Sequence, residues 1–136
     1  MSKVAIVIPS YEPDKRLIHL VNDLVSSGLG PIYIVNDGSG SGYDSIFESI
    51  KDTVEASGGA VLQHEVNRGK GRALKTAFEY ILNNDKDVEF VVTADSDGQH
   101  TCECIQRVID ASLKNKDCLD IVIRNTRIRS RQNNEQ

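Results

Sequence analysis

Apolar residues follow two alternating patterns along the chain. Short runs rich in β-branched residues have the length expected of buried strands, whereas the segments between them repeat apolar residues every three or four positions, as one face of a helix does. The predicted strands lie at residues 4–8, 32–35, 60–62, 90–94 and 119–123. The predicted helices lie at residues 17–25, 46–54, 74–82 and 105–113. We expect Pro9 to end the first strand, because proline lacks the N–H that a strand interior uses.

This β-α-β-α-β-α-β-α-β order predicts an α/β fold. Its three layers would be a mostly parallel, Rossmann-like sheet with helices on both faces. Ligands of such sheets bind beyond the carboxyl ends of the strands, near the point where strand order reverses. The polar loops that fall at this edge are residues 9–12, 36–42, 67–72 and 95–100. We therefore expect a binding site there.

The composition is that of one globular domain. The chain has 136 residues, of which 39% are hydrophobic and 26% are charged. Its apolar runs are strand-sized and no signal-peptide pattern opens it, so the predicted location is the cytoplasm. We expect a domain over residues 1–123. The remaining residues, 124–136, are polar and basic, and we predict that they form a disordered tail.

The charge distribution bears on the class of partner. The net charge is −4, and removing the four arginines and one glutamate of the tail leaves 12 basic and 19 acidic residues, or −7. An acidic body argues against nucleic acid as the main partner. A nucleotide-sized anion could still bind if a metal offsets the local carboxylates. The three cysteines fit no C-x-x-C spacing, which favours reduced, packing roles.

Two carboxylates stand directly after the fourth predicted strand. Asp95 and Asp97 are two residues apart, so they start on the same side of the chain, and Gln99 adds a neutral oxygen. Close like charges are easiest to explain if a divalent cation lies between them. Mg²⁺ and Mn²⁺ prefer oxygen ligands and often bind carboxylates together with substrate phosphates. This pattern predicts a metal site that holds a phosphorylated substrate.

Other interpretations of the D-x-D-G segment remain open. Aspartate and glycine are common in turns without any chemistry. An EF-hand loop is disfavoured, because its bidentate glutamate would fall on Gln106. A phosphatase with an aspartate nucleophile is a stronger alternative, although its motif normally follows the first strand.

The segment before the third predicted helix is suited to binding an anion. Gly69 and Gly71 let backbone amides approach a phosphate, and a helix N-terminus adds positive potential. Lys70 and Arg72 could neutralise a diphosphate, although the two glycines could also serve only a tight turn. His19 and His64 are interpreted as surface or packing residues. The glycines at 38–42 lack the spacing of a dinucleotide-binding fingerprint.

Together these loops resemble one enzyme family. The segments are VAIVIPSYEP at 4–13, IYIVNDGSGSG at 32–42, NRGKGRALKTAF at 67–78 and VVTADSDGQH at 91–100. They are similar to the inverting glycosyltransferases of GT-A fold, which use nucleotide-diphosphate sugars. The last segment most resembles the branch of dolichyl-phosphate mannose and glucose synthases and related polyprenyl-phosphate sugar transferases. The resemblance covers about the first 123 residues.

The resemblance implies a set of site residues. Tyr11 would stack on the base, Glu12 would lie near the nucleoside, and Asp37 would accept a hydrogen bond from uracil or guanine. Asn36 stands where the family usually has another aspartate. The implied donor-binding residues are Pro9, Tyr11, Glu12, Asp37, Gly71, Arg72, Asp95 and Ser96. The implied metal ligands are Asp95, Asp97 and Gln99, with Asp97 as the catalytic residue and Mg²⁺ or Mn²⁺ as the cofactor.

The implied reaction is direct displacement of a nucleoside diphosphate, UDP or GDP, from a sugar. The acceptor and any general base would lie in a half beyond the fifth strand, so we expect this chain to be the donor-binding part of a longer, truncated enzyme. A polyprenyl phosphate is the candidate acceptor, which would place the full-length parent at the inner membrane face. The face left by the missing half could pair two copies. Alternatives are a sugar-phosphate nucleotidyltransferase and a non-catalytic interaction domain.

Overall fold

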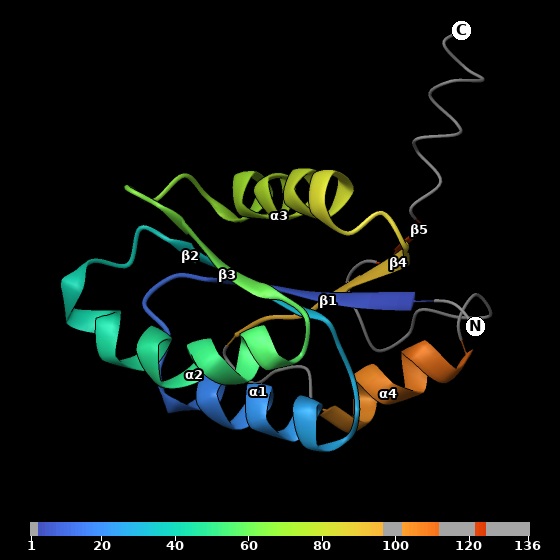
Figure 1. The fold of residues 1–136 in the computed structure, drawn as a ribbon. Coiled ribbons are helices and arrows are strands. Elements are labelled where there is room, and N and C mark those ends of the chain that lie inside the picture. The colour runs from blue at the N-terminus through green and yellow to red at the C-terminus, as the bar shows by residue number, and fades with distance from the viewer. Residues whose placement is uncertain (1–2, 97–101, 112–121, 125–136) are drawn as a thin grey trace, which may run out of the picture.

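A computed structural model of the chain describes residues 3–96, 102–111 and 122–124. Its centre is a five-stranded sheet in the order β3-β2-β1-β4-β5, in which β5 alone runs antiparallel to its neighbour (Figure 1). The strands are β1 (Lys3–Ser10), β2 (Ile32–Asp37), β3 (Ala60–His64), β4 (Val88–Thr93) and β5 (Val122–Arg124). The helices are α1 (Lys15–Ser26), α2 (Asp44–Ala56), α3 (Lys70–Asn84), α4 (Cys102–Ala111) and the short η1 (Ser41–Tyr43). The predicted mostly parallel α/β fold is confirmed.

Helices cover both faces of the sheet. In Figure 1, α3 lies above the sheet, and α1, α2 and α4 lie below it. Each face has its own core, because successive residues of a strand point to opposite sides. Ile6 and Ile8 of β1 pack toward α1 and α2, whereas Ala5 and Val7 pack toward α3. The three-four periodicity of the helices is what lets each present one apolar side to these cores.

Most element boundaries differ from the predicted ones by a few residues. The strand β1 continues through Pro9, which lies opposite Val35 in β2, so the prediction that Pro9 ends this strand was wrong. Proline is tolerated here because it stands one residue from the end of the strand, where a missing N–H removes little pairing. The strand β3 extends to His64, beyond its predicted end at residue 62, and the described part of the fifth strand is Val122–Arg124. Arg124, the first residue of the predicted tail at 124–136, is the last residue of β5, and residues 119–121 and 125–136 lie outside the described residues.

Helix α1 is capped at both ends. Asp14 precedes α1, and its carboxylate accepts a hydrogen bond from the backbone N–H of Arg16 at 2.9 Å, as an N-cap does. The Arg16 guanidinium and N–H hold the pKa of Asp14 at about 2, below its ordinary value. Gly28, with a positive φ of 76°, follows the end of α1, a position where glycine is common. Within the described ranges, none of the helices combines the length and apolarity needed to cross a membrane.

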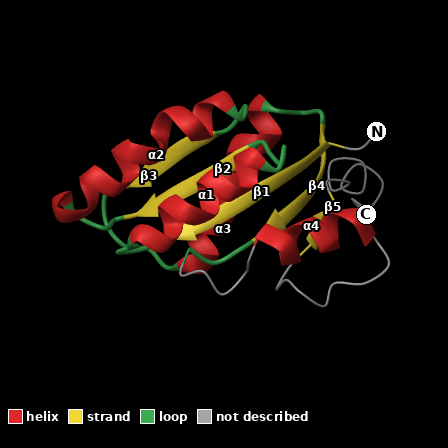
Figure 2. Ribbon diagram, turned by 90° about the horizontal axis from the view of Figure 1, so that it is seen from below, coloured by secondary structure: helices red, strands yellow, loops and turns green. Residues whose placement is uncertain are grey.

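The strand order places a switch point between β1 and β4. The chain moves from β1 outward through β2 to β3, and then returns to the other side of β1 to form β4. Figure 2 shows the parallel strands side by side from below. Because β1 and β4 are parallel neighbours, the loops that follow them lie side by side at the carboxyl edge of the sheet, where ligands of such sheets bind. This is the edge where the sequence predicts a site.

Candidate active site

A cleft of about 480 Å³ lies at this edge. It is bounded by the carboxyl ends of β1, β2 and β4 and by the start of α3. The residues that line it are Pro9, Ser10, Tyr11, Asp37, Asn67, Gly69, Lys70, Asp95 and Ser96. They come from four segments that are far apart in sequence, and the parallel sheet brings these segments together. The predicted position of the site is thus where the structure has a cleft.

The loops after β1 and β2 are tied to each other. The backbone N–H of Glu12 donates to the hydroxyl of Ser39 at 2.9 Å, and Glu12 has a positive φ of 51°. The side-chain oxygen of Asn36 in turn accepts from the backbone N–H of Ser39 at 3.0 Å. Ser39 and Asn36 are both buried. These contacts hold the loop that carries Tyr11 against the end of β2.

Tyr11 offers an exposed ring at the rim of the cleft. Half of its surface is accessible, at 50%, which is unusual for a large hydrophobic side chain of this protein. The neighbouring Glu12 carboxylate raises the pKa of the Tyr11 phenol above its ordinary value. The phenol is therefore neutral at physiological pH. A flat, neutral, accessible ring beside a polar cleft can stack on a planar group.

Asp37 ends β2, and its carboxylate is enclosed by hydrogen-bond donors. The residue is 3% exposed. Its donors are the His64 ring at 2.7 Å, the backbone N–H groups of Arg68 and Gly69 at 2.9 Å each, and the Asn67 amide at 3.2 Å. Burial alone would raise the pKa of Asp37, but the hydrogen bonds from His64, Arg68 and Gly69 outweigh it and hold this pKa below its ordinary value. The carboxylate is thus charged, and it fixes the start of α3.

A cation and an anion face each other across the cleft. Lys70, the first residue of α3, donates from Nζ to the Asp95 carboxylate at 3.1 Å. Both side chains keep solvent contact, with 50% of Lys70 and 26% of Asp95 exposed. Lys70 lines the cleft, so its ammonium stands where it can contact an anionic ligand there. An exposed pair of this kind contributes little to stability, so it can be opened by a ligand at small cost.

The structure brings together only part of the predicted site. Pro9, Tyr11, Asp37, Asp95 and Ser96 line the cleft. Among the described residues, Glu12, Gly71 and Arg72 are exposed and are not part of the lining. Asp97 and Gln99 lie outside the described residues. The roles predicted for all of these residues stay predictions.

Of the three predicted metal ligands, the described residues include Asp95. In the part of the chain that the structure describes, no group of three histidine, cysteine or carboxylate side chains is placed to hold a metal ion. Two of the three predicted ligands, Asp97 and Gln99, fall beyond those residues. The third, Asp95, has a partly exposed carboxylate that opens into the cleft. A hard oxygen ligand at this position suits Mg²⁺ or Mn²⁺.

His64 is the residue whose role the sequence did not indicate. It was interpreted as a surface or packing residue, but it is 9% exposed and contacts Asp37. The pairing of β2 with β3 places these two residues opposite each other at the ends of their strands. The available signal was its position, since His64 follows the third predicted strand as Asp37 follows the second.

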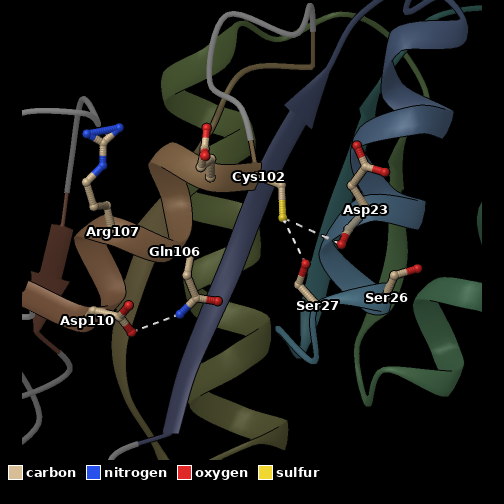
Figure 3. A pocket seen from close by; sticks show the side chains of 8 residues that line it. Asp23, Ser26, Ser27, Cys102, Gln106, Arg107 and Asp110 are labelled. Carbon is tan, nitrogen blue, oxygen red and sulfur yellow. Dashed lines mark hydrogen bonds between the residues drawn. The ribbon is translucent and has the colours of Figure 1, made fainter.

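A second, larger hollow of about 870 Å³ lies between α1 and α4 (Figure 3). There the Sγ atom of Cys102 lies 3.4 Å from the Ser27 hydroxyl and 3.5 Å from the carbonyl oxygen of Asp23. On the α4 side, Gln106 donates to Asp110 at 2.8 Å. These polar groups satisfy one another, and none of the residues at the ends of the strands lines this hollow.

Two curated relatives share sequence with this chain. An uncharacterized protein of Methanocaldococcus jannaschii is 26% identical, over 79% of this chain and 40% of its own length. A UDP-N-acetylglucosamine--dolichyl-phosphate N-acetylglucosaminyltransferase of Methanococcus voltae is 28% identical, over 78% of this chain and 45% of its own length. The chain therefore spans less than half the length of these relatives.

A solved structure shares the fold. It is a mannosyltransferase from Pyrobaculum calidifontis in complex with GDP-Man and Mn²⁺, with a TM-score of 0.60 at 17% identity, over 78% of this chain and 32% of that one. This likeness confirms the predicted GT-A fold. The model of the glycosyl transferase family 2 matches residues 5–136. The chain therefore belongs to glycosyl transferase family 2, as its four loop segments indicated.

Proposed function

We propose that this chain is the donor-binding part of a glycosyltransferase that takes a sugar from a nucleotide-diphosphate sugar. The observation that carries the proposal is the cleft at the switch point of the sheet, where an exposed aromatic ring, a lysine and a carboxylate from three different segments meet. Ligands of parallel sheets bind at this position. Membership of glycosyl transferase family 2 supports the same function.

The residues of the cleft have distinct roles in this proposal. Tyr11 stacks on the base, and Asp37, whose carboxylate already accepts four hydrogen bonds from the protein, holds the start of α3 beside the nucleotide. Lys70 neutralises charge on the diphosphate, since its ammonium already reaches across the cleft to a carboxylate. Breaking the bond to the sugar leaves negative charge on the departing diphosphate, so a cation at this position lowers the barrier. Gly71 and Arg72 lie in the first turn of α3. The N-terminus of this helix adds positive potential near the same diphosphate, and Arg72 adds a positive charge.

Asp95, Asp97 and Gln99 would hold a divalent cation, Mg²⁺ or Mn²⁺. Carboxylate and amide oxygens are the ligands that these ions prefer, and Asp95 already opens into the cleft. When bound, such an ion supplies Lewis-acid stabilisation of the leaving diphosphate. Asp97 is the proposed catalytic residue through this role. The mannosyltransferase of similar fold was solved with Mn²⁺ and GDP-Man, which supports the choice of cofactor and of a nucleotide-sugar donor.

A polyprenyl phosphate is the proposed acceptor. The name of the relative from Methanococcus voltae includes dolichyl phosphate, which is the support for this class. A phosphate acceptor is already anionic, so it needs no strong general base. Because the chain spans less than half of that relative, residues beyond those of this chain would bind the acceptor.

Isothermal titration calorimetry tests the donor site. We expect UDP or GDP to release heat with this chain in the presence of Mn²⁺, and little heat without the metal. The Asp95→Asn and Asp97→Ala variants should lose the metal-dependent part. Asp52→Asn, at an exposed position on α2, is the matched control and should bind as the wild type does. Absence of heat with both nucleotides would contradict the proposal.

A further inference from the structure

His64 occupies a buried position that the proposed chemistry does not use directly. Both of its ring nitrogens have partners: Nδ1 lies 2.7 Å from Asp37 Oδ1, and Nε2 lies 2.8 Å from the hydroxyl of Thr76 on α3. The side chains of His64 and Asp37 are only 8% and 4% exposed. A buried imidazole with two short hydrogen bonds has a fixed orientation.

The charge of the Asp37 carboxylate determines which atom is the donor in its hydrogen bond with His64. An ionised carboxylate can only accept hydrogen bonds, so the proton lies on His64 Nδ1. In the neutral ring, Nε2 is then an acceptor and takes the hydroxyl hydrogen of Thr76. The bond from Nδ1 to the carboxylate is charge-assisted, and such bonds are shorter and stronger than bonds between neutral groups.

Asp37 connects His64 to the cleft, because its carboxylate bonds both to the imidazole and to the loop before α3. Its Oδ1 atom accepts from His64 and from the backbone N–H of Arg68, and its Oδ2 atom accepts from Gly69. If the carboxylate turns, both backbone bonds weaken together. The segment that these bonds hold leads directly into Lys70.

We propose that His64 is a positioning residue for the donor site, acting through Asp37 on the loop of residues 67–69. This inference rests on the proposed function, since it assigns His64 to the binding of the same nucleotide. When His64 is lost, the loop spends part of its time in other conformations, and apparent affinity falls by the fraction that stays competent. A fall of the competent fraction to about a tenth gives about tenfold weaker binding.

Three variants separate positioning from stability. His64→Leu removes both hydrogen bonds, whereas His64→Asn keeps an N–H donor near the place of Nδ1 and restores only the bond to Asp37. Thr76→Val removes only the second bond. His19→Leu, at an exposed position on α1, is the control for loss of a histidine. Affinity for GDP or UDP with Mn²⁺ is measured by calorimetry at a temperature where thermal scans show every variant to be folded.

We expect about tenfold weaker binding in His64→Leu, and nearly wild-type binding in His64→Asn, Thr76→Val and His19→Leu. Amide hydrogen exchange should accelerate at Arg68 and Gly69 in His64→Leu only. If the wild type binds nucleotide and His64→Leu binds it equally well, the inference is overturned while the proposed function stands. Weakening by Thr76→Val as large as that by His64→Leu would also overturn it, because affinity would then follow stability. If the wild type binds neither nucleotide, the proposed function fails first.

Discussion

Replacing Asp37 by asparagine is expected to destabilise the domain more than any exposed substitution. The carboxylate accepts four hydrogen bonds from protein donors at 2.7 to 3.2 Å, and it is almost fully buried. An asparagine side chain has one acceptor oxygen, and its NH₂ group turns a donor toward groups that are themselves donors. At least two partly buried donors therefore lose their acceptor in Asp37→Asn.

The cost follows from the number of bonds that are lost. A buried donor without an acceptor costs about 1–3 kcal/mol. Two such donors, with partial relaxation of the loop, give an expected loss of about 2–4 kcal/mol in the free energy of unfolding. For a domain of this size, each kcal/mol lowers the melting temperature by about 3–5 °C. The midpoint of Asp37→Asn is therefore expected about 10 °C below that of the wild type.

The dependence on pH identifies the carboxylate as the cause. The folded-state pKa of Asp37 is lower than its unfolded value of about 4, so its contribution to stability is fully present above pH 4 and is lost as pH falls through the folded pKa. Urea unfolding of both proteins between pH 7 and pH 2 should show a difference that is constant near neutrality and shrinks below about pH 4.

Asp52→Asn, exposed on α2, is the matched control and should change the unfolding free energy by less than about 0.5 kcal/mol. A loss below about 0.5 kcal/mol in Asp37→Asn would refute the reasoning, since the four donors would then have other acceptors. A difference between wild type and Asp37→Asn that grows at low pH would refute the sign of the pKa shift.

Three further results are expected. Gly38→Ala should cost about 2–4 kcal/mol in thermal unfolding, because φ at Gly38 is +71° and an added Cβ would stand 2.2 Å from backbone atoms of the loop before α3; an unchanged midpoint would contradict this. Tyr33→Phe should cost about 1 kcal/mol in urea unfolding, because the buried Tyr33 hydroxyl donates to Asp85 at 2.8 Å; no change would mean that the hydroxyl is solvated. Lys70→Ala should weaken the binding of GDP or UDP, measured by calorimetry at low salt, about fivefold. It should change the free energy of unfolding by less than about 0.5 kcal/mol, because the pair of Lys70 with Asp95 is exposed. An unchanged affinity would show that Lys70 does not contact the nucleotide.

The fold was predictable because its signals are local. Each helix repeats apolar residues at its own period, and each strand is a short β-branched run, so the element order can be read without any long-range information. That order restricts the topology to a mostly parallel sheet. The prediction that Pro9 ends the first strand was wrong. A proline ends a strand only where its N–H would have been needed for pairing, and this depends on a neighbouring strand that the sequence does not show.

The location of the site could be predicted from the sequence, but the contacts between its side chains could not. Polar loops after buried strands locate the carboxyl edge, and Asp95 was identified from this pattern, whereas the roles of Tyr11 and Asp37 were implied by the resemblance to the family. Which side chains of that edge meet depends on strand register and helix rotation. The pairing of Asp37 with His64 requires the register of β2 on β3, and sequence periodicity does not supply it.

The central claim is that a cation beside Asp95 binds the diphosphate of a sugar nucleotide in the cleft between β1 and β4. The most direct measurement is a crystal grown with Mn²⁺ and GDP or UDP, with data collected at a wavelength where manganese scatters anomalously. We expect an anomalous peak about 2.2 Å from carboxylate oxygens of Asp95 and Asp97, next to the two phosphates, with the Lys70 ammonium moved from Asp95 toward the diphosphate. Nucleotide density elsewhere on the protein, or an empty cleft with the pair of Lys70 and Asp95 intact, would contradict the claim.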